Sequence, residues 1–236
     1  MIMATTITYP QESLVEVALS NLCRELFDFN SALVTSSLKE DVCTRDMHRL
    51  DSLNWQVSAG DVLLFDMDGT LIDTDVCNTN AYKMAIASVL GEDFAQLFNI
   101  ARIERRVLRE RLSWISEKQL ADIIAQKEKF YTQFIDEIRI IPSTMEILNR
   151  FGETHKVVLV TNARRGRTMQ TLRHLHLENT FDAIVTKDDC NGTDKCTTAI
   201  SILGLNPNKV WVFENEVVQA MTAVSAGINI NHIILR

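Results

Sequence analysis

The chain has 236 residues, of which 46% are hydrophobic and 23% are charged. This composition is typical of a soluble globular protein with a packed core, and it excludes a disordered chain. The formal net charge of −7 argues against nucleic-acid binding, because phosphate backbones favour positively charged patches.

The first residues and the cysteines bear on the compartment. Residues 1–10 lack a basic region followed by an apolar core, so no secretory signal is expected. We also expect no membrane partner, because no stretch reaches about 18 apolar residues without a charge. The five cysteines are scattered and form no CxxC pair, which predicts neither a zinc site nor a disulfide framework. Reduced thiols favour a cytoplasmic protein.

In chain order, the first predicted element is a helix over residues 10–30. Its apolar side chains recur at helical spacing and share one face: Leu14, Val17, Ala18, Leu22, Leu26 and Phe29. The pattern weakens over residues 31–58, where short helices and turns are expected. We therefore predict a helical N-terminal extension over residues 1–58.

Five short apolar runs then predict buried parallel strands. They cover residues 61–66, 156–161, 182–186, 209–214 and 231–235. Helical segments separate the later strands, at residues 143–151, 166–174, 197–203 and 217–226. Strands that alternate with helices imply a parallel sheet covered on both faces. The predicted fold is α/β, with a three-layer, Rossmann-like core built on a five-stranded parallel sheet, and the core comprises residues 59–75 and 142–236.

A long connection separates the first strand from the second. Helical periodicity predicts helices within it over residues 82–90, 94–112 and 117–138. A connection of this length needs packing of its own. We therefore predict a helical cap over residues 76–141, inserted just after the first strand.

Polar side chains follow the predicted strands. In an open parallel sheet, ligands bind at the carboxyl ends of the strands. The residues that converge on this edge are Asp66 and Asp68 after the first strand, Thr161 and Asn162 after the second, Lys195 after the third, and Glu214 and Asn215 after the fourth. The pattern predicts one site at this edge.

Four segments resemble motifs of the haloacid dehalogenase superfamily. The segment FDMDGTLIDT, at residues 65–74, is similar to the first motif, DxDGT after an apolar strand. The run VVLVTNARRGRT resembles the second motif, TDK supplies the lysine of the third, and VWVFEN stands where the acidic fourth motif belongs. The resemblance covers residues 61–236 and is to the phosphoglycolate phosphatase and β-phosphoglucomutase branch.

The resemblance implies a magnesium-dependent phosphatase that acts on a small phosphorylated metabolite. It assigns Asp66 as the nucleophile that forms an aspartyl-phosphate, and Asp68 as the general acid and base. Thr161 and Lys195 would hold the transferring phosphoryl group, with Lys187 as the alternative lysine. A phosphomutase using the same residues, or a weakened or inactive binding or regulatory protein, are the alternative functions. The sequence defines neither the substrate nor the oligomeric state.

The remaining assignments concern phosphate and metal. The expected phosphate contacts are Gly69, Thr70, Asn162 and Arg164. Arg165 and Arg167 also follow the second motif, and the pattern fits anion contact and solvation equally well. The expected magnesium ligands are Asp66, Asp68 through its backbone carbonyl, Glu214 and Asn215. Relatives usually carry an aspartate at the last of these positions. Because Asn215 offers only a neutral oxygen, we expect weaker metal binding or reduced turnover, unless Glu216 compensates.

Overall fold

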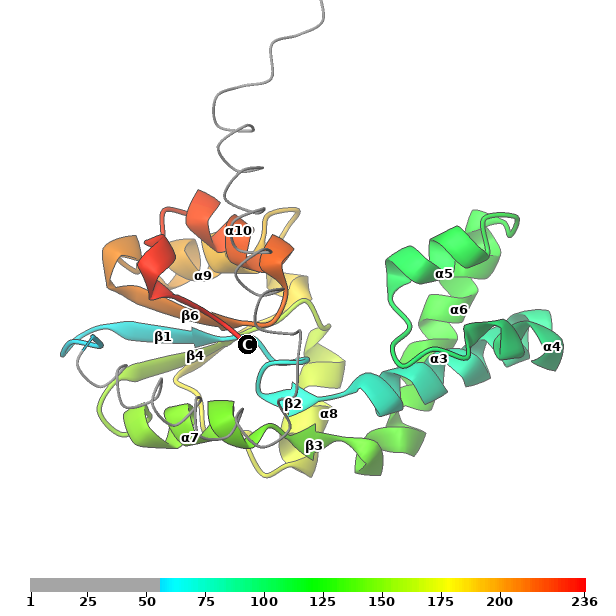
Figure 1. Cartoon of the computed structure of the whole chain (residues 1–236), viewed down its shortest axis with the longest axis horizontal. Coiled ribbons are helices and arrows are strands. Elements are labelled where there is room, and N and C mark those ends of the chain that lie inside the picture. The colour runs from blue at the N-terminus through cyan, green and yellow to red at the C-terminus, as the bar shows by residue number, and fades with distance from the viewer. Residues whose placement is uncertain (1–55) are drawn as a thin grey trace, which may run out of the picture. The chain divides into compact units, whose positions relative to one another are not determined.

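The computed structural model describes residues 56–236 (Figure 1). The predicted helix over residues 10–30, and the predicted N-terminal extension up to residue 55, lie outside the described residues. Within the described part of the chain, no helix combines the length and the apolar character needed to cross a bilayer.

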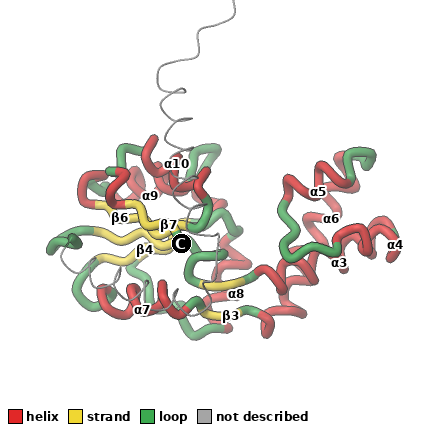
Figure 2. Tube along the Cα trace, in the orientation of Figure 1, coloured by secondary structure: helices red, strands yellow, loops and turns green. Residues whose placement is uncertain are grey.

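Five parallel strands form the central sheet in the order β5-β4-β1-β6-β7. Their bounds are β1 (Val62–Phe65), β4 (Lys156–Val160), β5 (Ala183–Val185), β6 (Val210–Glu214) and β7 (Ile233–Leu235). Each lies within one of the five predicted apolar runs, and the strands lie side by side between helices (Figure 2). The predicted five-stranded parallel sheet is confirmed.

Helices cover both faces of this sheet, which confirms the three-layer α/β architecture. Helices α7 (Pro142–Phe151) and α8 (Arg165–His174) lie on one face, and α9 (Lys195–Leu203) and α10 (Val217–Ser225) on the other (Figure 1). The three central strands, β4, β1 and β6, are buried because both of their faces are covered, whereas the edge strands β5 and β7 are only partly buried. Three 3-10 turns complete the connections: Lys187–Asp189, Pro207–Lys209 and Ile230–His232.

The register of the central strands sets the position of two carboxylates. In the pairing of β1 with β6, Phe65 lies opposite Phe213, and their rings stack with centroids 4.5 Å apart. The next backbone N–H, that of Asp66, donates to the carbonyl oxygen of Phe213 at 3.0 Å. Asp66 and Glu214 therefore leave the sheet side by side.

Between β1 and β4 the chain forms a helical insertion, by which we mean the elements from α3 to η2. They are α3 (Asp75–Leu90), α4 (Glu92–Ala95), η1 (Gln96–Phe98), α5 (Arg105–Arg111), α6 (Glu117–Phe130) and η2 (Tyr131–Glu137). The insertion has an apolar cluster of its own, which includes Ile86, Phe98, Leu108 and Ile123. Helix α6 begins where a capping box forms between Ser116 and Gln119.

The predicted single helix over residues 94–112 is wrong. The chain is helical only to Phe98 and again from Arg105, with a loop between. The hydroxyl of Thr79 explains the break, because it donates to the carbonyl of Ala101 and accepts from the N–H of Ile103. These side-chain bonds replace the intrahelical bonds that a continuous helix would need.

A short antiparallel pair was not predicted. Strands β2 (Ile72–Asp73) and β3 (Arg139–Ile140) pair where the chain enters and leaves the helical insertion. The N–H of Ile141 extends the pairing by donating to the carbonyl of Leu71 at 2.9 Å. Two-residue strands are too short to show an alternating pattern, so sequence periodicity does not reveal them.

Candidate active site

Three buried side chains form a charged cluster at the carboxyl edge of the sheet. The ammonium nitrogen of Lys195 lies 2.5 Å from Asp66 Oδ1 and 2.7 Å from Glu214 Oε2. All three side chains are almost completely buried. Lys195 opens helix α9, whose first turn is held by Asp194, since this carboxylate accepts from two backbone N–H groups. The cap fixes the start of the helix and thereby the direction of the lysine.

The cluster has more negative than positive charge. Burial raises the pKa of Asp66; Lys195 opposes this shift and Glu214 adds to it. Burial alone would lower the pKa of Lys195, but the two carboxylates together raise it. One ammonium is shared by two carboxylates, so the ionised cluster has one uncompensated negative charge. Such a site favours a further cation.

Asp68 has a partner of its own. Its carboxylate accepts two hydrogen bonds from the guanidinium of Arg167, at 2.8 and 3.3 Å, and one from the hydroxyl of Thr74 at 2.8 Å. Burial acts to raise the pKa of Asp68, but Arg167 and then Thr74 lower it below its usual value. These contacts therefore hold the side chain as an ionised carboxylate.

The catalytic candidates line one cavity of about 520 Å³. Those predicted from the sequence are Asp66, Asp68, Thr161, Asn162, Lys195 and Glu214. Lys187 also reaches the cavity, but it is exposed, whereas Lys195 is buried against Asp66. The helical insertion supplies the other wall, including Asn78, Tyr82, Arg102, Arg105, Lys127 and Glu128. A cavity of this size suits a small metabolite.

Lys127 is a cavity residue that the sequence analysis did not single out. The residue is only 4% exposed, and its ammonium lies 4.8 Å from the ring centre of Tyr131 and 5.5 Å from that of Tyr82. Burial, followed by the charge of Arg167, lowers the pKa of Lys127 to about 8. A signal was present in the sequence. Lys127 follows Leu120 at a spacing of seven residues and so continues the buried stripe of α6.

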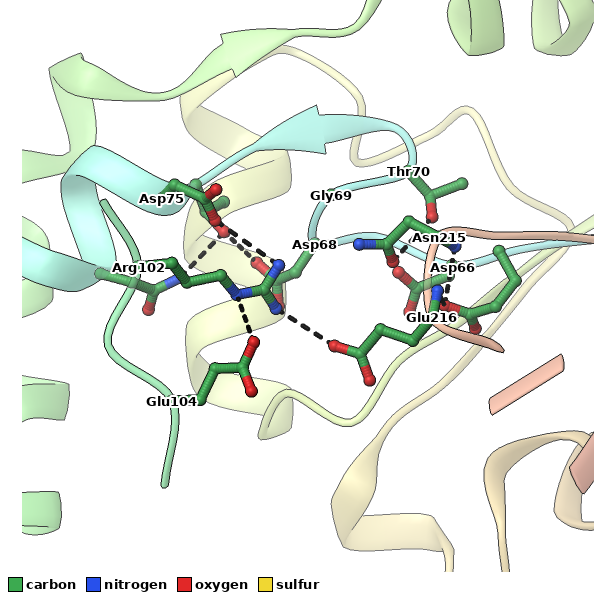
Figure 3. Close-up of polar contacts among 12 residues, drawn as sticks. Asp66, Asp68, Gly69, Thr70, Asp75, Arg102, Glu104, Asn215 and Glu216 are labelled. Atoms are coloured by element: carbon green, nitrogen blue, oxygen red, sulfur yellow. Dashed lines mark hydrogen bonds and ion pairs between the residues drawn. The ribbon is translucent and has the colours of Figure 1, made fainter. Parts of the chain in front are cut away.

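Gly69 and Thr70 contact Asn215 and are not among the residues that line the cavity. The side-chain amide of Asn215 has an inner terminal atom, which faces Glu214, and an outer one, which faces Gly69. Gly69 has a φ of 85°, and a Cβ at this position would lie 2.2 Å from the outer amide atom. The hydroxyl of the buried Thr70 lies 3.3 Å from the inner amide atom (Figure 3). Of the other two predicted phosphate contacts, Asn162 lines the cavity, and Arg164 is exposed and lines a neighbouring pocket together with Arg105 and Arg167.

The donors available for a metal are oxygens. No group of three or more His, Cys, Asp or Glu side chains suited to a metal is found within residues 56–236. The carboxylates of Asp66 and Glu214, the Asp68 carbonyl and the Asn215 amide are nevertheless adjacent. The inner amide atom of Asn215 lies 3.1 Å from Glu214 Oε1 and 3.3 Å from the Asp68 carbonyl oxygen. Neighbouring ligands of an octahedral magnesium ion are about 3 Å apart. The residues fit magnesium, with a neutral amide as one donor.

Comparison with known proteins identifies the family. The family model described as haloacid dehalogenase-like hydrolase matches residues 63–233. The chain belongs to this family, as the motif resemblance implied.

Individual relatives add detail. A phosphorylated carbohydrates phosphatase of Thermotoga maritima is 26% identical over 185 residues, which is 71% of this chain and 82% of that protein. A structure described as a predicted phosphoglycolate phosphatase, from Haemophilus somnus, matches with a TM-score of 0.60 at 16% identity, covering 75% of this chain and 85% of the other. The structure of CbbY from Rhodobacter sphaeroides in complex with phosphate matches with a TM-score of 0.59 at 18% identity, covering 74% and 85%. At these identities the two structures show a shared fold.

Proposed function

We propose that this protein is a magnesium-dependent phosphatase that hydrolyses a small phosphorylated metabolite. The observation that supports this most strongly is the buried cluster of Asp66, Lys195 and Glu214, which lines the same cavity as Asp68 and Thr161. A nucleophile, a proton-transfer group and phosphate-binding cations are what phosphoryl transfer through a covalent intermediate needs.

The first half of the reaction uses Asp66 as the nucleophile. One of its oxygens forms a bond to phosphorus while the bond from phosphorus to the leaving oxygen breaks, which gives an aspartyl-phosphate. Lys195 and the hydroxyl of Thr161 stabilise the charge on the transferring phosphoryl oxygens. Bound magnesium, held by Asp66, Glu214, the Asp68 carbonyl and Asn215, would supply further neutralisation of that charge.

The second half uses Asp68. It takes a proton from water, whose oxygen attacks phosphorus and releases Asp66 together with inorganic phosphate. In the first half Asp68 gives the leaving oxygen a proton that it has first taken up from the substrate monoanion or from solvent, so its ion pair with Arg167 has to loosen as the substrate binds. Arg167 is therefore placed to transfer its contact from Asp68 to the substrate anion during the cycle.

The helical insertion acts as a cap that selects the substrate. It contributes Arg102, Arg105 and Lys127 to the cavity, opposite the charged cluster of the core. Cations on this side favour a substrate with an anionic or hydroxyl-rich body besides the phosphoryl group. The named activity of the Thermotoga maritima relative makes sugar phosphates the first class to assay.

The test is phosphate release from a panel of phosphorylated metabolites, with and without magnesium. We expect metal-dependent turnover that falls by about 10³-fold or more in Asp66→Asn, as expected for loss of a covalent nucleophile. Near-normal rates in this variant would remove Asp66 from its role. Product analysis with a sugar phosphate distinguishes a hydrolase, which releases phosphate, from a phosphomutase, which retains it. The absence of release from every substrate would favour the binding or regulatory alternative.

A further inference from the structure

The side chain of Asn215 lies among oxygen atoms. Its inner amide atom faces Glu214 Oε1 at 3.1 Å, the Asp68 carbonyl oxygen at 3.3 Å and the hydroxyl of Thr70 at 3.3 Å. The first two neighbours can only accept hydrogen bonds, while a hydroxyl can donate or accept. The chemical identity of the inner atom therefore decides whether this group of atoms is stable.

An amide can present either of two atoms to this position. With nitrogen inward, Asn215 donates hydrogen bonds to both Glu214 and the Asp68 carbonyl. With oxygen inward, the amide oxygen, a carboxylate oxygen and a carbonyl oxygen meet without a proton between them. That arrangement is unfavourable unless a cation lies between the oxygens, and it then has the spacing of an octahedral magnesium site.

The surroundings allow both orientations. The hydroxyl of Thr70 donates to an inward oxygen, whereas an inward nitrogen uses its two hydrogens on Glu214 and the Asp68 carbonyl and needs no bond from Thr70. On the other side, the outer amide atom packs against Gly69, where a Cβ at 2.2 Å would block the side chain. Exchange of nitrogen and oxygen leaves the shape of the amide almost unchanged, so both forms fit beside Gly69.

We propose that Asn215 is a two-state metal ligand. Its nitrogen closes the metal-free site by donating to Glu214 and the Asp68 carbonyl, and its oxygen coordinates the cation after the amide rotates. The proposal rests on the proposed function, because it assumes that magnesium binds at this site. The proposal explains the difference between an amide and an aspartate at this position. The amide lets the metal-free site keep its hydrogen bonds, but it offers the cation one negative charge fewer.

The test compares Asn215→Asp with the wild-type protein. An aspartate cannot donate, so the metal-free variant places a further negative charge beside Glu214. We expect its melting temperature in EDTA to fall by at least about 3 °C. We also expect magnesium to bind about tenfold more tightly by titration calorimetry, since affinity follows the number of charged ligands. The stabilisation by magnesium should therefore be larger in the variant than in the wild type.

Two further variants separate the contributions. Asn215→Ala removes the donor without adding charge, and we expect lower metal-free stability with no gain in magnesium affinity. Asn208→Asp makes the same chemical change at an exposed position and should change neither measurement.

Unchanged metal-free stability and unchanged magnesium affinity in Asn215→Asp would overturn the proposal, even where phosphatase activity is present. Magnesium binding by Asn215→Asp with higher metal-free stability than the wild type would overturn it as well. Magnesium binding by neither protein would overturn it together with the metal requirement of the proposed function.

Discussion

Two lysines are almost completely buried in the described part of the chain, and their surroundings are opposite. Lys195, in the core, lies within 2.7 Å of two carboxylates, which raise its pKa. Lys127, in the helical insertion, has Glu128 at 3.6 Å, but it also lies against aromatic rings and near the like charge of Arg167, and burial together with that charge lowers its pKa to about 8. Burial acts on both ammonium groups, but only Lys195 has partners that offset it.

The difference shows which charge the folded protein needs. Without Lys195, Asp66 and Glu214 would be buried without a counter-ion, so this ammonium stabilises the core. The charge of Lys127 costs free energy in the folded protein, on the order of 3 kcal/mol for its lowered pKa. An anion that enters the cavity would remove this cost, so Lys127 favours binding of an anionic ligand.

The largest expected effect is that of Lys195→Met. This substitution leaves two buried carboxylates without their shared cation, which is expected to lower the free energy of unfolding by about 3–5 kcal/mol. Chemical denaturation at pH 7 measures the change. Activity should fall as well, because the same ammonium stabilises the phosphoryl oxygens in the proposed reaction.

Lys187→Met is the matched control for this prediction. Lys187 lines the same cavity but is exposed, so we expect a change in unfolding free energy within about 0.5 kcal/mol. Equal stability of the two variants would show that the ion pairs of Lys195 contribute nothing to the fold.

The comparison also shows how far the sequence could predict the site. Asp66 directly follows β1, Glu214 ends β6 and Lys195 begins α9, so the order of strands and helices alone brings them to one edge of the sheet. The contacts of Lys127 and Arg167 depend on how helices pack across the cavity, which helical periodicity does not specify. The break after Phe98 has the same origin, because it follows from a hydrogen bond to a distant threonine. Local patterns thus predicted the core well and the insertion less well.

Lys127→Met should have an effect of opposite sign on stability. Removing a buried charge that lacks a full counter-charge is expected to raise the free energy of unfolding by about 1–3 kcal/mol at pH 7. The same change removes a cation from the cavity, so KM for the substrate should rise while kcat changes less. Lys129→Met, at an exposed position two residues away, should change neither quantity.

The pH dependence provides an independent check on the same variant. Between about pH 8 and pH 10 the unfolded chain still binds a proton at Lys127 that the folded protein has released, so wild-type stability rises with pH. The advantage of Lys127→Met should therefore shrink as the pH increases from 7 to 10. A variant that is less stable than the wild type at pH 7, with an unchanged KM, would show that the charge of Lys127 supports the fold and not a ligand.

The smallest expected effect concerns the ion pair between the insertion and the core. Arg102 lies 3.2 Å from Glu216 and also contacts Asp75 and Glu104 (Figure 3). The side chains of Arg102 and Glu216 are 29% and 44% exposed, so solvent screens the ion pair. A double-mutant cycle with Arg102→Gln and Glu216→Gln should therefore give a coupling free energy below about 1 kcal/mol. As a control, Glu110→Gln breaks an exposed ion pair within α5. It should change the free energy of unfolding by a similarly small amount and leave KM unchanged. A coupling well above this value would mean that this partly exposed ion pair, like the buried pairs of Lys195, contributes to the stability of the folded protein.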